Sequence, residues 1–248
     1  MTLFYDYLKT AYLGYAAIFV CLGLGFLFLR RVDEGEVGPG YWAISFFLNS
    51  LGFLLWSGVI PLLPRQYFLL GELFHISGFL FLVCGAYRFT GNAYKAWNLV
   101  AILAWLALWA ASILVLRSIP VLGMLGLKAL RTVLMVWAGG MILAKPANPR
   151  PLGRSLAGWS LIAWGLYILA TGFVHLPSML HLAFGFLVGF QILAALGIVA
   201  MVVERMRLRA EKSEKLLASL EGLLPICAYC KKIRDEGDNW QTIESYIE

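Results

Sequence analysis

The sequence predicts an all-α integral membrane protein built as a bundle of seven transmembrane helices. Hydrophobic residues make up 61% of the 248 residues and charged residues only 14%, whereas a soluble domain carries about 25% charged residues. The mean hydropathy is +0.79, more apolar surface than a soluble fold can bury, so the lipid bilayer is the expected partner. The net charge of +6 comes from basic residues scattered over loop ends, which indicates no nucleic-acid partner.

Seven apolar runs are each close to the about 20 residues that cross the hydrocarbon core. The first run is too long for the apolar segment of a cleaved signal peptide, so we expect it to remain as a spanning helix. Short segments with turn residues separate the runs, which predicts antiparallel neighbours. The runs are Ala11–Leu29, Tyr41–Leu62, Tyr67–Tyr87, Trp97–Leu116, Val121–Leu143, Ser155–Val174 and Met179–Val203.

Lysine and arginine residues gather on one side of the predicted membrane. They follow the first, third, fifth and seventh runs, and only three lie on the other side. Since cytoplasmic loops carry the excess of Lys and Arg, this bias predicts an outside N-terminus and a cytoplasmic C-terminus. The larger group is Arg30, Arg31, Arg88, Lys95, Lys145, Arg150, Arg154, Arg205, Arg207 and Arg209, and the smaller is Lys9, Arg65 and Arg117.

The segment 204–222 changes abruptly to a charged helical pattern. Apolar residues recur at steps of three and four, which predicts a coiled-coil-like helix and a homodimer through residues 203–224. A single amphipathic helix on the membrane surface is the alternative. Gly222 and Pro225 predict where the helix ends. The residues that recur at these steps, which we call the seam, are Val203, Met206, Ala210, Ser213, Leu217, Leu220 and Leu224.

Two pairs of ionisable residues lie deep inside predicted spans, where charge is costly and usually faces a partner or a cavity. Glu72 and His75 share one face of the third run, and Lys128 and Arg131 have the same spacing in the fifth. The two runs cross in the same direction, so both pairs lie at matching depth. We therefore expect an ion pair between Glu72 and either Lys128 or Arg131.

The other polar candidates lie towards the outer half of the predicted bundle. His175 and His181 bracket the turn between the last two runs, and Asn49 could join the histidines. One interpretation is an outward-facing cleft for a small ligand, an ion or a quinone-like molecule. The other is a static ion pair and satisfied polar groups that only fix helix packing. The three histidines could also ligate a metal or a haem, although nothing in the sequence fixes their spacing. The expected aromatic lining is drawn from Trp42, Trp56, Tyr67 and Trp105.

Cys227 and Cys230 form a Cys-x-x-Cys turn, the local geometry of half a tetrahedral zinc site. A second chain, the acidic residues among 235–238, or sequence beyond residue 248 could complete the site. A redox pair and two packed thiols are the alternatives. Haem attachment would require a histidine where Lys231 stands. The acidic residues that could act as metal ligands are Asp235, Glu236 and Asp238. A short helix that contains Trp240 is expected to cover the Cys-x-x-Cys turn.

Residues 223–247, LLPICAYCKKIRDEGDNWQTIESYI, closely resemble a tail segment of many bacterial signalling proteins. That tail follows PAS, receiver or membrane sensor modules and reads roughly LLPICxxCKKIRDDxGxWxxIExYI. The resemblance implies signal transduction and carries over no established biochemical activity. A second cysteine pair usually follows in that family, which suggests that this chain is truncated.

These observations predict a seven-helix sensory module at 1–203, a signalling helix at 204–222 and a Cys tail at 223–248 in a bacterial inner membrane. Motifs of hydrolases, zinc proteases and nucleotide-binding enzymes are absent from the sequence, so we expect no catalytic domain and a cytoplasmic signalling partner. The alternative is a transporter or a haem- or quinone-binding redox protein that uses Glu72, Lys128, Arg131 and the histidines.

Overall fold

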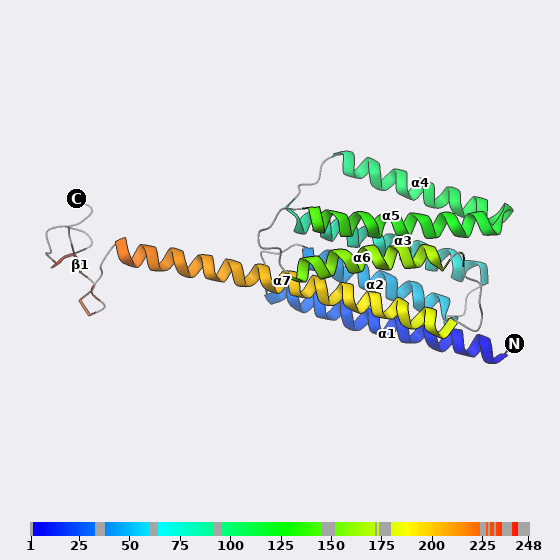
Figure 1. Cartoon of the computed structure of the whole chain (residues 1–248), viewed down its shortest axis with the longest axis horizontal. Coiled ribbons are helices and arrows are strands. Elements are labelled where there is room, and N and C mark those ends of the chain that lie inside the picture. Colours follow the sequence, from blue (N-terminus) through cyan, green and yellow to red (C-terminus); the bar gives the residue numbers. More distant parts are fainter. Residues whose placement is uncertain are drawn as a thin grey trace. The chain divides into compact units, whose positions relative to one another are not determined.

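A computed structural model describes residues 2–32, 38–59, 64–91, 96–144, 152–171, 173, 180–223, 227, 229–230, 232–234 and 240–242. Within these residues the chain forms seven α-helices and one short antiparallel β-ladder (Figure 1). The elements are α1 (Thr2–Val32), α2 (Gly38–Trp56), α3 (Pro64–Phe89), α4 (Ala96–Ser118), α5 (Pro120–Ala144), α6 (Leu152–Ala170), α7 (Leu180–Leu223), β1 (Ile233–Arg234) and β2 (Trp240–Gln241).

The chain divides into two compact units, Met1–Met201 and Val202–Glu248. The first unit contains α1–α6 and the N-terminal part of α7, and the second contains the rest of α7 and the β-ladder. The division lies close to the predicted boundary at residue 203. Helix α7 itself is uninterrupted from Leu180 to Leu223, so the last predicted span and the predicted signalling helix are parts of one helix.

Five of the described helices are long and apolar enough to cross a membrane, namely α1, α3, α4, α5 and α7. Helices α2 and α6 fall short because Asn49 in α2, Arg154 in α6 and the glycine, serine and tryptophan residues of both lower their mean hydropathy. These two 19-residue helices bury much of their surface inside the bundle, and a helix surrounded by protein needs fewer apolar side chains than one that faces lipid. The structure is thus that of a helical membrane protein, while seven spans and an outside N-terminus remain predictions.

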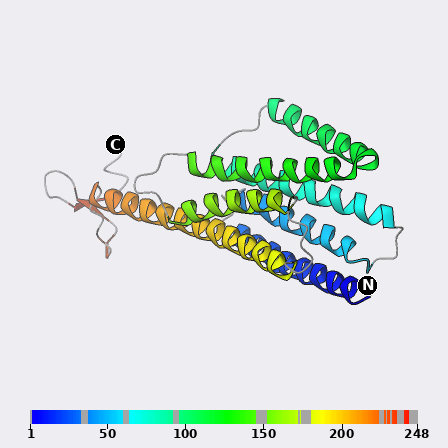
Figure 2. The same cartoon turned by 45° about the vertical axis from the view of Figure 1, so that its right-hand side comes forward.

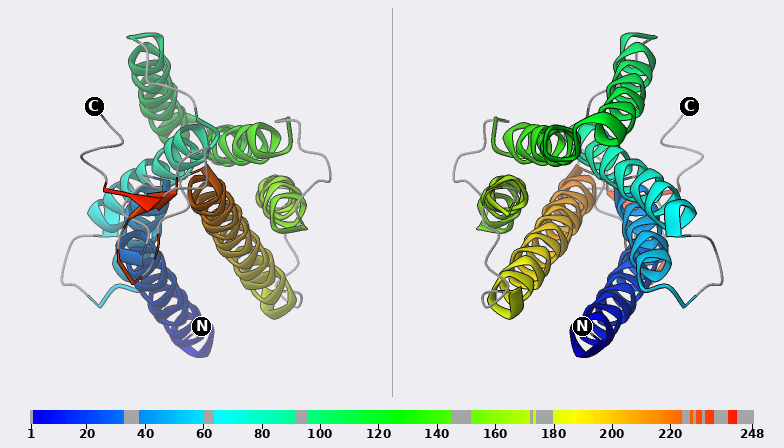
Figure 3. Two further views of the ribbon diagram at one scale, coloured as in Figure 1. Left: turned by 90° about the vertical axis from the view of Figure 1, so that its left-hand side faces the viewer. Right: turned by 90° about the vertical axis from the view of Figure 1, so that its right-hand side faces the viewer.

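The first unit contains two rows of helices, which contact each other between α3 and α5 and, through the rings of Phe79 and Trp164, between α3 and α6. Helices α1, α2 and α3 form the first row, and α5 and α6 form the second, with less extensive contact between α3 and α5 (Figure 2). Helix α4 contacts α5 at the outer edge of the bundle, and none of its residues Asn98–Leu116 is buried (Figure 3). We call the contact between α3 and α5 the row junction.

The first row is held by stacked aromatic rings and by hydrogen bonds between helices. Phe26 and Phe46 stack with ring centroids 5.3 Å apart. Ser50 Oγ donates to Ala16 O at 2.8 Å, which ties α2 to α1. Trp42 Nε1 on α2 donates to a carbonyl of α3, Leu82 O, at 3.3 Å. Trp42 therefore holds α2 against α3.

Glycine residues allow the helices of the second row to pack closely. A Cβ added at Gly139 of α5 would meet the carbonyl oxygen of Gly158 on α6, so the two backbones touch there. Thr132 Oγ1 also donates to Gly165 O at 2.8 Å across the same contact. Small residues let membrane helices approach closely enough for dispersion forces to hold them together. Helix α6 packs on α7 in the same way, because a Cβ at Gly197 would meet the backbone of Ala157.

The described part of the tail is a small hairpin. Ile233 pairs with Gln241, and Arg234 pairs with Trp240. The prediction of a helix starting near Trp240 is therefore wrong for Trp240–Gln241, which form a strand. Cys227 N donates to Lys232 O at 2.9 Å, and this bond closes the turn that contains Cys230.

Candidate functional site

An ion pair between Glu72 and Arg131 joins the two rows of helices at the row junction. Arg131 Nη2 donates to Glu72 Oε2, and the two side chains are only 13% and 4% exposed. Glu72 lies about two turns after the start of α3 at Pro64, and Lys128 lies about two turns after the start of α5 at Pro120. The charged residues of the two helices therefore lie at the same depth in the bundle. The expected ion pair is confirmed, with Arg131 rather than Lys128 as the partner.

Aromatic rings surround the guanidinium of Arg131. Its Cζ lies 5.7 Å from the centroid of the Trp56 ring and 6.0 Å from that of Phe79. A cation over an aromatic face is stabilised by the ring quadrupole, and the effect grows when water is excluded. Arg131 Nε is nonetheless buried and has no hydrogen-bond partner among the described residues. The pair is therefore well enclosed but incompletely satisfied.

Lys128 lies beside this ion pair without joining it. Its Nζ donates to Thr171 Oγ1 at 3.2 Å, and Thr171 Oγ1 in turn donates to Ile168 O at 2.7 Å. Among the described side chains, Lys128 has no carboxylate within ion-pair distance. The site thus contains one carboxylate and two cations, and the second cation has a neutral partner.

His75 and Asn49 form a separate polar contact between α3 and α2. Asn49 Nδ2 donates to Ser45 O at 2.9 Å, which assigns Asn49 Oδ1 as the acceptor for His75 Nδ1–H at 2.9 Å. The imidazole ring lies 4.5 Å from the Phe53 ring and 4.4 Å from the Trp56 ring. His75 therefore packs behind Trp56 as a buried histidine that helps to fix helix packing.

A cavity of about 430 Å³ opens beside the charged residues. Side chains from α1, α2, α3 and α5 form its walls, so it lies at the row junction. Trp56 is the one predicted aromatic that lines it, whereas Trp105 lines another cavity and the side chain of Tyr67 lies outside the described residues. The lining residues are Tyr12, Trp56, Phe68, Glu72, Met124, Leu127, Lys128 and Arg131.

The structure does not place every predicted ligand-binding residue. His175 lies outside the described residues, and so does the side chain of His181. Tyr12, Phe68 and Thr171 were not among the predicted site residues, although the first two line the cavity and the third binds Lys128.

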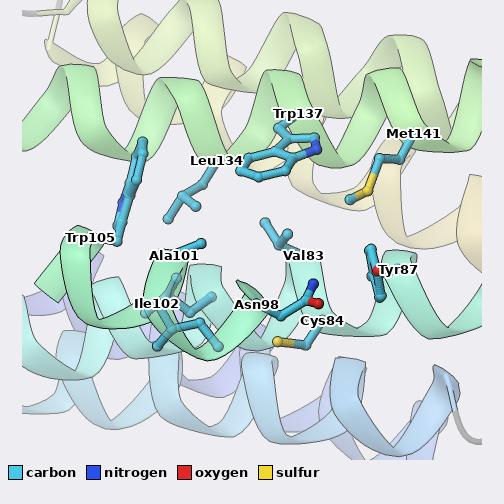
Figure 4. A pocket seen from close by; sticks show the side chains of 11 residues that line it. Val83, Cys84, Tyr87, Asn98, Ala101, Ile102, Trp105, Leu134, Trp137 and Met141 are labelled. Atoms are coloured by element: carbon cyan, nitrogen blue, oxygen red, sulfur yellow. The ribbon is translucent and has the colours of Figure 1, made fainter. Parts of the chain in front are cut away.

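A second cavity, of about 60 Å³, lies between α3, α4 and α5 (Figure 4). Its walls are mostly apolar, with the indoles of Trp105 and Trp137 on two sides and the amide of Asn98 below. A volume of this size has room for a few water molecules at most. The 430 Å³ cavity, which is lined by Glu72, Lys128 and Arg131, is a better candidate for a ligand site than this one.

The Cys tail provides two thiols close together. Hydrogen bonds from the backbone of Cys230 and of Tyr229, and from the Cys230 side chain, lower the pKa of the Cys227 thiol. A thiolate is the form that binds metals and reacts with electrophiles. No group of three or more His, Cys, Asp and Glu that could hold a metal ion occurs in the described part of the chain. Asp235, Glu236 and Asp238 lie outside that part.

With the geometry described, the chain can be compared with known proteins. It matches no protein-family model, no curated protein and no solved structure. The resemblance of residues 223–247 to a signalling-protein tail therefore stays a prediction. The function has to be argued from the site itself.

Proposed function

We propose that this chain is a membrane sensor that binds a small ligand at the row junction and signals through α7 to its Cys tail. One observation carries the proposal: the buried ion pair between Glu72 and Arg131 lies beside a 430 Å³ cavity at the contact that joins the two rows. An ion pair that only fixed helix packing would need no adjoining cavity. Ionisable groups inside a membrane protein commonly mark a functional site.

A ligand at this place can change the contact between the rows. Arg131 is paired with Glu72 and lies at the wall of the cavity, so a ligand that attracts Arg131 competes with Glu72. In a water-poor site the loss or gain of such a pair is worth several kcal/mol. That energy is enough to shift a two-state equilibrium between helix arrangements.

Helix α7 provides the route from the site to the tail. Helix α5 carries Arg131 and packs closely on α6, and α6 packs on α7 where Gly197 meets Ala157. Helix α7 then continues without a break to Leu223. A displacement of α5 and α6 would therefore reach α7 through close-packed backbones, which transmit movement well.

We place the sensor in a bacterial inner membrane with seven spans, the N-terminus outside and the tail in the cytoplasm, on the basis of the Lys/Arg bias and the tail resemblance. The seam residues Val203 and Leu217 are 50% and 58% exposed in the single chain, as a dimer contact through residues 203–224 requires. Such a dimer would bring two pairs of Cys227 and Cys230 together, and four thiolates complete a tetrahedral zinc site. A cytoplasmic signalling partner would bind this tail.

Transmission can be tested with a nitroxide label on the full-length chain in nanodiscs. The label is attached at Leu208→Cys, an exposed position of α7, after the four native cysteines are replaced. We expect Glu72→Gln to change the mobility of the label. Leu73→Ala, a substitution at the neighbouring exposed position, should leave the mobility of the label unchanged. The double variant Glu72→Gln, Arg131→Gln removes both charges together and controls for misfolding. An unchanged spectrum in both Glu72 variants would contradict sensing through α7.

The dimer has a matched test. Leu217 lies on the predicted seam and Leu216 does not, yet both are exposed to a similar extent, 58% and 55%. In a chain whose four native cysteines are replaced, Leu217→Cys should cross-link two chains under oxidation, and Leu216→Cys should not. Zinc at about one ion per two chains would support the shared site.

A transporter is the competing function that uses the same charges. Transport would be favoured over sensing if protons or ions enter liposomes that contain the wild-type protein and do not enter liposomes that contain the Glu72→Gln variant. An absorption band of the purified protein in the visible range would favour a haem-binding protein.

A further inference from the structure

The charges that line the 430 Å³ cavity do not balance. Glu72 and Arg131 neutralise each other in their ion pair. Lys128 adds a positive charge, and its partner is the neutral hydroxyl of Thr171. An ammonium group has three donors, and only one of them is used by a described residue. The cavity therefore has one positive charge in excess, which favours a ligand with one negative charge.

The remaining walls of the cavity are apolar and partly aromatic. Tyr12, Trp56, Phe68, Met124 and Leu127 provide these walls. The Trp56 indole meets the Tyr12 ring edge-on, with centroids 5.8 Å apart and an angle of 64°. Aromatic rings arranged this way present flat and edge surfaces that suit a planar ring of a ligand.

The position of the charges relative to the rings sets the shape of the ligand. Trp56 lies against Arg131, so one end of the cavity combines an aromatic face with a neutralised guanidinium. Lys128 precedes Arg131 by about one helical turn on α5, and it carries the unbalanced positive charge. The volume is in the range of small-molecule sites, which is about 300–1,000 Å³. A ring with a short anionic head fits both the volume and the charge.

We propose that this cavity binds a planar aromatic monocarboxylate, with the carboxylate at Lys128 and the ring against Trp56. The proposal deepens the proposed function, because it names the ligand of the same site. A phosphate ester would bring a second negative charge into a site that offers one unbalanced cation. A cationic ligand would meet like charges on Lys128 and Arg131.

The test uses full-length protein in nanodiscs and two probe acids, benzoate and indole-3-carboxylate, with benzamide as a neutral isostere of benzoate. Binding is measured by saturation-transfer NMR and equilibrium dialysis. We expect at least one acid to bind at millimolar concentration and benzamide to bind about tenfold more weakly than benzoate, as loss of one charge-assisted contact requires. Failure of both acids to bind, or equal binding of benzoate and benzamide, would overturn the proposal.

Variants of Lys128 locate the carboxylate. Lys128→Gln should weaken binding of the acids about tenfold or more, and Lys128→Arg should retain most of it. Lys9→Gln removes a charge from an exposed position of α1 and should have no effect. Unchanged binding in a folded Lys128→Gln variant would overturn the proposal.

The outcome for the ligand and the outcome for sensing can be separated. If α7 responds to Glu72→Gln but neither acid binds, the ligand class is wrong and the sensor proposal stands. If the acids bind through Lys128 but the α7 label never responds, the binding site stands and the sensor proposal falls.

Discussion

Helix α5 is packed in opposite ways on its two sides. Towards α6 it presents Gly139, which touches the backbone at Gly158. Towards α3 it presents Arg131, which pairs with Glu72 beside the cavity that Lys128 also lines. The first contact is held by shape and the second by charge.

The difference indicates which contact can change and which cannot. Close-packed backbones have no alternative arrangement of similar energy, so α5 and α6 should move together. A charged side chain beside a cavity can exchange one partner for another at a smaller cost. We therefore expect perturbations of the glycine contact to affect stability alone, and perturbations of the row junction to affect ligand binding as well.

The largest effect is expected from Arg131→Ala. It leaves the carboxylate of Glu72 buried without a partner, and such a change costs about 3–5 kcal/mol. The melting temperature of the purified protein in detergent measures the loss. Because the cost comes from the unpaired charge, Glu72→Gln combined with Arg131→Gln should be more stable than Arg131→Gln alone. Additive losses in this double-mutant cycle would show that the two side chains do not interact.

The glycine contact can be broken with adjacent matched substitutions. A Cβ at Gly139 would meet the Gly158 carbonyl and Ile162, whereas a Cβ at Gly140 would meet nothing within 4 Å. Gly139→Ala should cost about 1–3 kcal/mol through overpacking. Gly140→Ala should be neutral or stabilise the helix, since alanine favours helix over glycine by about 1 kcal/mol. Thermal melting of the two variants is the measurement.

The binding of benzoate sharpens this second test. Folded Gly139→Ala protein should bind benzoate as the wild type does, because Gly139 does not line the cavity. A large loss of affinity in this variant would mean that the two sides of α5 are not independent.

A smaller stability effect, with a clear effect on binding, is expected from Gly71→Ala. The indole of Trp56 lies directly against Gly71, so an added methyl group must displace the ring that lines the cavity. We expect a loss of about 1 kcal/mol in stability and markedly weaker binding of aromatic acids. Gly14→Ala on α1, where the added Cβ meets nothing within 4 Å, is the matched control. Equal binding by both variants would place the ligand away from Trp56.

Much of the row junction could be predicted from sequence because charge inside an apolar run is rare. Glu72 and Arg131 stand out for that reason, and their equal depth follows from run lengths alone. The choice between Lys128 and Arg131 could not be predicted, since it depends on how α3 and α5 are rotated about their axes. That rotation is set by packing and leaves no local signal.

Other features of the site had no distinctive signal in the sequence. Tyr12 and Phe68 are aromatic residues near helix ends, as occurs in any membrane protein. Thr171 resembles any threonine at a helix end. The number of helices was predicted well because long apolar runs are unambiguous, but α2 ends at Trp56, earlier than the predicted Leu62. Gly58, with a φ of 68°, follows that end and marks the turn that stops the helix.

The smallest effects are expected from two isosteric substitutions, Thr132→Val and Thr171→Val, which compare the two contacts of α5. Thr132→Val removes a hydrogen bond to Gly165 O across the glycine contact, and Thr171→Val removes the hydroxyl that binds Lys128. An interhelical hydrogen bond in a membrane protein is worth about 0.6 kcal/mol on average, so each variant should melt only slightly lower. Their effects on benzoate binding should differ. Thr132→Val should leave the affinity unchanged, whereas Thr171→Val frees the Lys128 ammonium from its neutral partner and should retain or strengthen binding. Weaker benzoate binding in Thr171→Val would mean that the hydroxyl, rather than the ammonium, is what the carboxylate recognises.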